Sequence, residues 1–444
     1  MRRGPRNLRI TTDGVGRTQF AGVSLLEQFV RRMGLRLALA RHIRFAQRNN
    51  WYSISESLEA LLDPLVLGLG RIETTEPLRS NGVFHCLAGL PGYPDATILR
   101  RFLNRFARRG RNSFVKLHDA WRAAMLRPSA QAVFDLDRTV LTVYDHQERA
   151  EVGYNPKKRG RPSYLALLCL EGNTQDGWEG SYHPGDTHVS TITIPLLEHP
   201  FPKLPAAIRE VRVRADSAFY DHEIIEFIEG KRAFYAIVAR LTRPLKNRLS
   251  GLRYRQVASA VWAGEFQYCP RGWPRERRFV VIRRPVPEEP SAPLSLFQMG
   301  GYTYQALVTN LTLQPLNLWR FYNRRARAGL IIRESKYAYA LGKIPTNDFQ
   351  ANEAFFQIVL LAYNLLNWFQ RLCVPPHLQR ATLQRLRQHL LVVPAQLVRP
   401  GGAPTLPLPA NYPAARDFLG TLQRLRHLQP PFQPLQADVG GTHP

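Results

Sequence analysis

The sequence predicts an α/β fold, and three observations lead to this prediction. Residues 211–214 alternate valine with arginine and are followed by a helical pattern at 221–228, so a strand passes into a helix there. The most apolar run, residues 355–369, carries three amide side chains and is too short to cross a membrane, which favours a buried helix. Runs rich in β-branched and aromatic residues predict further strands at 132–145, 163–170, 233–239 and 302–311.

The composition indicates a folded chain with an anionic partner. A length of 444 residues is sufficient for two or three domains, and an apolar content of 44% is typical of a globular protein. The net charge is +27, from 61 Lys+Arg against 34 Asp+Glu, and it points to nucleic acid or another anionic surface. Arginine dominates the basic residues, and its guanidinium binds phosphate through two hydrogen bonds at once.

The cysteines and the start of the chain indicate a cellular compartment. The basic residues at the start are not followed by the apolar stretch of a secretory signal. We therefore expect a cytoplasmic protein without a membrane-spanning segment. The four cysteines stand far apart with no Cys-x2-Cys pair, which argues for a reducing compartment and against a zinc site: Cys86, Cys169, Cys269 and Cys373.

Residues 1–125 are predicted to form a basic, helical region. The clearest helix runs from Asp95, which stands where an N-cap residue belongs, to residue 109. Its apolar residues form one stripe, and Arg100 and Arg101 lie largely off that stripe. An arginine-rich face on a short helix among other helices favours a DNA-docking unit, and a solvated helix face is the alternative.

Three aspartates stand at strands where a charge is costly. Asp135 and Asp137 interrupt an otherwise apolar strand, and a buried carboxylate is unfavourable unless it is paired or binds a metal. Asp216 stands at the carboxyl end of the next alternating strand, just before a turn into a helix. That is where α/β sheets present their ligands. The sequence therefore predicts a carboxylate site at one edge of the sheet.

A basic loop lies between the strands at 132–145 and 163–170. It carries Lys157, Lys158, Arg159 and Arg161 among glycine and proline residues. The string KRGRP resembles an AT-hook, whose extended arginines enter the minor groove of DNA. The loop is expected to contact DNA phosphates whether or not this five-residue match reflects an AT-hook.

A second basic feature is the stretch at residues 322–343. If it forms one helix at about 100° per residue, Tyr322, Arg325, position 329 and Lys336 fall within an arc of roughly 60°, and Arg333 joins them. A phenol aligned with several cationic groups is suited to a polyanion. An ordinary basic surface helix is the alternative.

These motifs together resemble a large family of bacterial insertion-sequence transposases with a DDE active site. That family carries the pattern Y-x2-R-x3-E-x6-K, in which the Glu is the third metal-binding carboxylate, and here its position is Gly329. The string Asp137-Arg138-Thr139 matches the first carboxylate motif, so Asp137 is preferred over Asp135, and R-A-D-S-x-F matches the second at Asp216. The resemblance covers roughly residues 85–430.

The resemblance implies both a fold and a reaction. It implies an RNase-H-like mixed sheet with helices on both faces and an all-β insertion. It further implies that Asp137 and Asp216 are catalytic and bind two Mg²⁺ or Mn²⁺ ions for DNA cleavage and strand transfer. The expected partner is double-stranded DNA, at terminal inverted repeats and at a target, with a homodimer on DNA left open. We expect the protein to be associated with a bacterial nucleoid.

The same resemblance suggests five parts of the chain. They are a DNA-binding region at 1–125, the first part of the catalytic domain at 126–240, a β-rich insertion at 241–302, the second part of the catalytic domain at 303–390, and a carboxyl-terminal appendage at 391–444.

Because position 329 is a glycine, the sequence leaves open whether the protein is catalytically active. Substitute acids are Glu334, which is about 140° round the helix from position 329, and Glu353 or Asp348 in the following helix. The alternative function is a catalytically impaired, transposase-derived DNA-binding protein or repressor. An RNA-binding protein is less well supported, because no RNA-binding motif appears.

Overall fold

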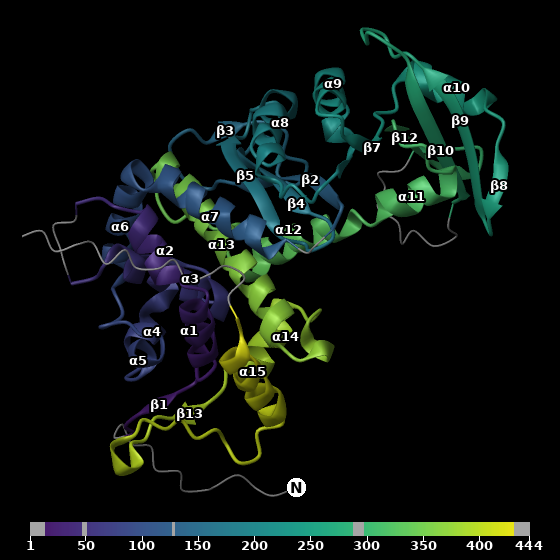
Figure 1. Ribbon diagram of the computed structural model, residues 1–444. Helices are drawn as coiled ribbons and strands as arrows, with labels where there is room; N and C mark the ends of the chain where they lie inside the picture. Colours follow the sequence, from purple (N-terminus) through teal and green to yellow (C-terminus); the bar gives the residue numbers. More distant parts are fainter. Residues whose placement is uncertain (1–13, 47–50, 127–128, 287–296, 430–444) are drawn as a thin grey trace, which may run out of the picture. The chain divides into compact units, whose positions relative to one another are not determined.

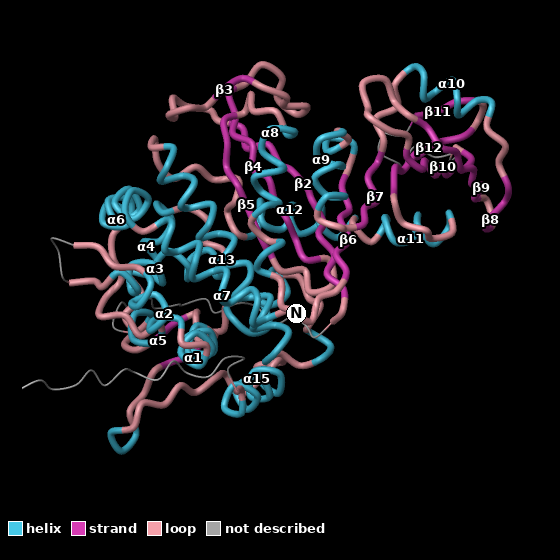
Figure 2. The backbone as a smooth tube through the Cα atoms, turned by 45° about the horizontal axis from the view of Figure 1, so that its top comes forward, coloured by secondary structure: helices cyan, strands magenta, loops and turns pink. Residues whose placement is uncertain are grey.

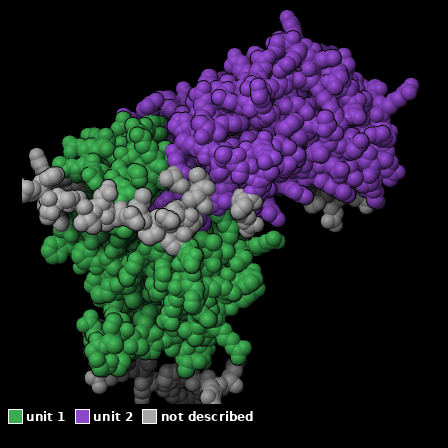
Figure 3. All heavy atoms as spheres, viewed as in Figure 1, with its two compact units in different colours: residues 1–117, 336–444 green, residues 118–335 purple. Residues whose placement is uncertain are grey.

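The structure is a computed structural model that describes residues 14–46, 51–126, 129–286 and 297–429. It divides into two compact units, which Figure 3 colours separately. Unit 1 comprises residues 1–117 and 336–444, and unit 2 comprises residues 118–335. Among the described residues, no helix is both long enough and apolar enough to cross a membrane. The end of the predicted appendage, residues 430–444, lies outside the described residues.

Among the described residues of unit 1, the regular elements are helices apart from two short strands (Figure 2). Residues 23–42 form two helices, because Gly34 adopts a positive φ of 67° between them. The elements are β1 (Arg17–Thr18), α1 (Val23–Arg32), α2 (Leu35–His42), α3 (Ile54–Leu67), α4 (Glu76–Arg79), α5 (Phe84–Leu87), α6 (Ala96–Arg109), α13 (Phe349–Cys373), α14 (Leu383–Leu386), β13 (Ala395–Gln396) and α15 (Ala415–His427).

The caps and apolar stripes of these helices follow from the sequence. Asp95 caps α6 by accepting hydrogen bonds from the backbone N–H groups of Thr97 and Ile98, as its position predicted. The apolar stripe of α6 packs against α13, which also contacts α3. Helix α13 is buried along most of its length and forms the core of unit 1, as the apolar run at 355–369 indicated.

Unit 2 contains a mixed eleven-stranded sheet (Figure 1). Strands β2, β6 and β7 are parallel to one another, and β4 pairs antiparallel with β2. The order is β3-β4-β2-β6-β7-β12-β10-β9-β8, with β5 beside β4 and β11 beside β12. The strands are β2 (Gln131–Thr142), β3 (Glu151–Val152), β4 (Pro162–Glu171), β5 (Gly177–Pro184), β6 (Glu210–Ala215), β7 (Phe234–Val238), β8 (Arg255–Ala258), β9 (Val261–Tyr268), β10 (Arg277–Pro285), β11 (Phe297–Met299) and β12 (Tyr302–Thr309).

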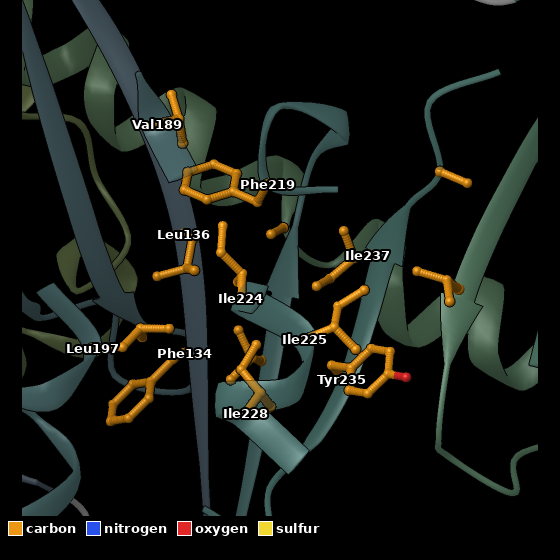
Figure 4. Packing of buried hydrophobic residues seen from close by; sticks show 14 of the residues in the cluster. Phe134, Leu136, Val189, Leu197, Phe219, Ile224, Ile225, Ile228, Tyr235 and Ile237 are labelled. Atoms are coloured by element: carbon orange, nitrogen blue, oxygen red, sulfur yellow. The ribbon is translucent and has the colours of Figure 1, made fainter. Parts of the chain in front are cut away.

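Helices cover both faces of this sheet. Helices α8 (Val189–Glu198), α9 (His222–Gly230) and α10 (Arg243–Gly251) contribute to one core, in which Phe134 and Leu136 of β2 face Ile224 of α9 (Figure 4). Alternate residues of the strands point to the opposite face. There α11 (Pro315–Asn323) packs through Leu318 and Tyr322 on β7, β10 and β12. Asp135, Asp137 and Arg214 therefore point to the face that carries α11.

The segment at residues 241–302 differs from the all-β insertion that we expected. It begins with helix α10, and its strands β8 to β11 do not form a separate sheet. They extend the main sheet beyond β12, because β10 pairs with β12 over eight residues and β12 pairs with β7. Only long-range strand pairing decides whether such strands join an existing sheet, and the local pattern carries no information about it.

The basic stretch at residues 322–343 is two helices instead of one. Helix α11 ends at Asn323 and α12 (Ala326–Ala338) begins after a tight turn at Arg324 and Arg325. The N–H groups of Arg325 and Ala328 bond to carbonyls three residues back, which tightens the turn. Helix α12 ends before Lys343, so that residue does not extend the basic face. Helices α7 (Arg111–Met125) and α12 each run from one unit into the other.

A buried histidine gives unit 2 a defined response to acid. His118 of α7 is 2% exposed, and burial, together with nearby Arg122 and Lys203, holds its pKa well below the usual value of 6.5. Below pH 6.5 the unfolded chain binds a proton that the folded chain does not, so the free energy of unfolding falls by up to about 1.4 kcal/mol per pH unit. His118→Leu should flatten this dependence in denaturant titrations between about pH 6.5 and 5. His188→Gln, at an exposed position, is the control and should leave it unchanged.

Candidate active site

Two neighbouring parallel strands bring Asp137 and Asp216 together. The last paired residues of β2 and β6 are Leu136 and Ala215, and each aspartate directly follows its member of this pair. Leu136 and Ala215 point into the core under α8 and α9, so the two aspartates point to the opposite face. Asp216 ends its strand by accepting a hydrogen bond from the N–H of Ala218. This is the edge of the sheet where the sequence predicted a carboxylate site.

Arg325 connects the two carboxylates. Its Nη2 atom lies 3.3 Å from Asp137 Oδ1 and 3.8 Å from Asp216 Oδ2. Its Nε and Nη2 groups also donate to the carbonyl of Leu136, over 3.1 and 2.8 Å. The two carboxylate oxygens are therefore separated by no more than the sum of the two ion-pair distances, which suits a shared pair of divalent ions.

The site is partly enclosed, and its charges interact strongly. The side chains of Asp137 and Arg325 are 15% and 12% exposed, whereas that of Asp216 is 39% exposed and faces solvent. Burial raises the pKa of the Asp137 carboxyl, the Arg325 guanidinium opposes this shift, and the charge of Asp216 adds to it. Burial acts to lower the pKa of Arg325, but the charge of Asp137 and other neighbours raises it overall. The site therefore holds a cation between two carboxylates.

Position 329 faces the carboxylate of Asp137. A Cβ atom built on Gly329 would lie 3.9 Å from Asp137 Oδ2, which is its nearest neighbour outside the backbone of α12. The φ angle of Gly329 is not positive, so a larger residue is compatible with the backbone there. The residue is exposed, and a Cβ atom there would meet no atom closer than ordinary van der Waals contact.

The substitute acids lie in different surroundings. Glu334 is half-buried on α12, five residues after Gly329. Glu353 belongs to unit 1, where its carboxylate forms an ion pair with Arg111. Asp348 caps α13 and pairs with Arg108 over 3.2 Å in the same unit.

The sequence as a whole decides the family. Residues 2–430 match the family of transposase DDE domains, group 1. The chain belongs to this family. A solved structure, the cryo-EM structure of the piggyBac transposase synaptic complex with hairpin DNA, shares 11% sequence identity with a TM-score of 0.43, over 84% of this chain and 78% of that chain. A search of curated proteins found no match.

The acidic groups at this site of the DDE-transposase-family chain are the two carboxylates joined by Arg325. Among the described residues, no group of three or more His, Cys, Asp or Glu side chains is placed to hold a metal ion. Mg²⁺ prefers hard oxygen ligands and is commonly bound through one or two carboxylates plus water and substrate phosphate. The carboxylates of Asp137 and Asp216 fit this requirement. Gly329, whose Cβ position lies near Asp137, adds no carboxylate to this pair.

The expected DNA contacts of this transposase-family chain fall into two groups. Exposed cationic groups comprise Lys157, Lys158, Arg159 and Arg161 in the loop before β4, with Arg101 on α6 and Arg333 on α12. The others are held or covered: Arg100 pairs with Glu73, Lys336 is half-buried, Tyr322 is 8% exposed, and Arg325 belongs to the carboxylate site.

One residue at the site was not found from the sequence. Arg214, two residues before Asp216, is buried and pairs with Asp135, two residues before Asp137. The available signal was that Arg214 shares a strand face with Asp216 two residues later, but the alternation of valine with arginine in β6 did not distinguish it from Arg212. A buried charge such as that of Arg214 needs a partner. Asp135 is therefore occupied by this pair and does not take the place of Asp137.

Proposed function

We propose that this protein is a transposase that binds element-end DNA and catalyses metal-dependent DNA cleavage and strand transfer. The observation that carries the proposal is the placement of Asp137 and Asp216 at the ends of two neighbouring parallel strands, on one face and joined by Arg325, in a chain of the DDE transposase family. A pair of aspartates at the carboxyl edge of a sheet is suited to phosphoryl transfer.

The arrangement of strands supports an RNase-H-like core. In the order β5-β4-β2-β6-β7, the first three strands are antiparallel and the last three are parallel, with helices on both faces. The proposed domain division remains that of the sequence, with the catalytic domain in two parts on either side of residues 241–302. The DNA-binding role of residues 1–125 belongs to the same proposal.

The proposed mechanism assigns a task to each residue of the site. Asp137 and Asp216 would hold two Mg²⁺ or Mn²⁺ ions, which when bound activate the attacking oxygen and stabilise the leaving oxygen of an in-line displacement. Arg325 holds the two carboxylates in register through its ion pairs and its bonds to the Leu136 carbonyl, and its charge opposes the rise that burial causes in the pKa of Asp137. The exposed cations of the loop at 157–161 would bind DNA phosphates.

A second candidate function is DNA binding without efficient cleavage. The observation that favours it is Gly329, because the position facing Asp137 Oδ2 has no side chain to complete a set of three carboxylates. The exposed basic residues needed for DNA binding do not depend on that acid. Such a protein would act as a repressor or as an element-end binding factor.

Removing divalent ions distinguishes the two functions. A transposase should nick plasmid DNA that carries the element end when Mg²⁺ or Mn²⁺ is present. EDTA should abolish nicking, because the two aspartates alone provide no Lewis acid to activate the attacking oxygen and stabilise the leaving oxygen. DNA binding, measured by fluorescence anisotropy, should survive EDTA in both cases. Nicking that persists in EDTA would contradict the enzymatic proposal, and binding without nicking in either metal would favour the second candidate.

The affinity for duplex DNA should fall linearly with salt on a log–log plot, since the net charge of +27 implies many phosphate contacts. Replacing Arg159 and Arg161 with alanine should lower the slope by about one for each lost contact. Anisotropy titrations at several salt concentrations measure both effects. Arg275→Ala is the matched control, because this exposed arginine is paired with Glu229. A slope near zero for the wild type would refute phosphate-dominated binding.

A further inference from the structure

A buried ion pair lies directly beneath the candidate active site. Arg214 donates from Nε to Asp135 Oδ1 over 2.6 Å and from Nη2 to Asp135 Oδ2 over 2.7 Å. The two side chains are 3% and 4% exposed, so the pair is almost fully removed from water. This two-bond geometry is the most directional one available to an arginine and a carboxylate. It joins β2 to β6, where the two residues stand opposite each other.

The remaining nitrogen of the Arg214 guanidinium bonds to α11. Its Nη1 group donates to the carbonyl of Phe321 over 2.7 Å, and its guanidinium lies 4.9 Å from the centroid of the Phe321 ring. The backbone of Gly172 lies close against the pair, since a Cβ atom on Gly172 would lie 2.5 Å from Arg214 Nη2 and 3.0 Å from Asp135 Oδ2. The Arg214 guanidinium therefore holds β2, β6 and the end of α11 in one arrangement.

These three elements are the ones that carry the candidate active site. Asp135 stands two residues before Asp137, and Arg214 stands two residues before Asp216, so each pair points to the same face of the sheet. Phe321 stands four residues before Arg325, at the end of α11. A shift at the buried pair would therefore displace all three groups of the site together.

Stability alone does not account for a pair in this position. Removing two charges from water is costly, and replacing a buried ion pair with apolar residues of similar size is often neutral or stabilising. An apolar pair would fill the same space, but it would not set the register of two strands and a helix end through directional bonds. The benefit expected from the ion pair is therefore geometric precision at Asp137, Asp216 and Arg325.

We propose that Asp135 and Arg214 are positioning residues that hold Asp137, Asp216 and Arg325 in the geometry needed to bind divalent ions. This inference rests on the proposed function, since it assigns metal binding to the two aspartates. Neither residue touches the substrate in this proposal. Each acts through the strand or helix to which it is bonded.

The test is the double variant Asp135→Leu/Arg214→Met, which replaces the pair with apolar side chains. It should unfold at the same denaturant concentration as the wild type. Its affinity for Mn²⁺, measured by electron paramagnetic resonance without DNA, should fall about 10- to 100-fold, as when supporting partners of metal ligands are removed. Amide hydrogen exchange at residues 321–325 should become faster, because the Phe321 carbonyl has lost its donor.

The matched control replaces another arginine–carboxylate pair of unit 2. Arg277 and Glu229 are 4% and 16% exposed and connect β10 to α9. The variant Glu229→Leu/Arg277→Met should retain the wild-type Mn²⁺ affinity and the wild-type exchange at residues 321–325. An equal loss of Mn²⁺ affinity in the control would show that any damage to unit 2 suffices, and it would overturn the inference.

Two further outcomes are decisive. Unchanged Mn²⁺ affinity and unchanged exchange at residues 321–325 in the Asp135/Arg214 variant would overturn the positioning role. If that variant does not fold, Arg214→Lys serves instead, since lysine keeps the charge but cannot bond to both oxygens of Asp135 and to Phe321 at once. Wild-type Mn²⁺ affinity and wild-type exchange at residues 321–325 in Arg214→Lys would overturn the inference as well. If the wild type binds no Mn²⁺, the proposed metal site fails, and the exchange result still decides whether the pair positions α11.

Discussion

Asp137→Asn should abolish metal-dependent nicking of element-end DNA while DNA binding persists. Asparagine has the same shape but no charge, so the divalent ions lose a ligand worth several kcal/mol in the transition state, or about 10³-fold or more in rate. The fold should tolerate the change, because Arg325 keeps its contact with Asp216 and its two hydrogen bonds to the Leu136 carbonyl. Single-turnover nicking and anisotropy titrations measure the two effects separately.

The control for this variant is Asp145→Asn. Asp145 is exposed in the loop after β2, where its carboxylate accepts a hydrogen bond from the N–H of His146. The Asp145→Asn change removes one negative charge from the same unit without altering the site, so nicking should stay at the wild-type rate. Asp216→Asn should behave like Asp137→Asn. Wild-type nicking by either Asp137→Asn or Asp216→Asn would remove that aspartate from the proposed metal site.

Local patterns were sufficient to predict most individual elements. The strands around Asp137 and before Asp216 were predicted from alternation and β-branched content, because these patterns depend only on which face of a strand is buried. The capped helix after Asp95 and the buried helix at 355–369 followed in the same way from capping and apolar spacing. In each case the physical cause of the element lies within a few residues of sequence.

The remaining features depend on contacts between distant residues. The strands of the segment at 241–302 join the main sheet through pairings with β12 and β7, and no local pattern reports such a pairing. The turn at Arg324 and Arg325 arises where Arg325 bonds to the Leu136 carbonyl of β2. Arg214 was one of two arginines in an alternating strand, and its partner Asp135 lies 79 residues earlier. Charged residues inside strands therefore indicated where the site lies, but only the folded structure showed which residues pair with them.

Gly329→Glu should increase Mg²⁺-dependent nicking of element-end DNA about 10³-fold or more and leave DNA affinity unchanged. The backbone of α12 accepts a side chain at this position, and a new Cβ would lie 3.9 Å from Asp137 Oδ2. A glutamate there places a third carboxylate beside the first two, where it can complete the ligands of a divalent ion. Removing a glycine from a helix interior also favours folding by roughly 1 kcal/mol or less. Single-turnover nicking with anisotropy titrations tests both expectations.

The isosteric variant Gly329→Gln separates the charge from the other changes. Glutamine gives α12 a similar helix propensity and a side chain of the same length, but it supplies no anionic ligand. It should therefore nick DNA no faster than the wild type. An equal gain for Gly329→Gln and Gly329→Glu would show that the helix, and not the missing carboxylate, limits the reaction.

Glu334 offers a contrasting expectation, since it is the nearest acid along α12. If Glu334 already serves as the third ligand, the wild type nicks efficiently, Glu334→Gln abolishes nicking, and Gly329→Glu changes little or does harm by adding a fourth carboxylate. If position 329 is the vacant ligand position, Glu334→Gln leaves the weak wild-type nicking unchanged and Gly329→Glu restores the reaction. Because the two expectations are opposite for both variants, measuring the two side by side decides where the third carboxylate of this site belongs.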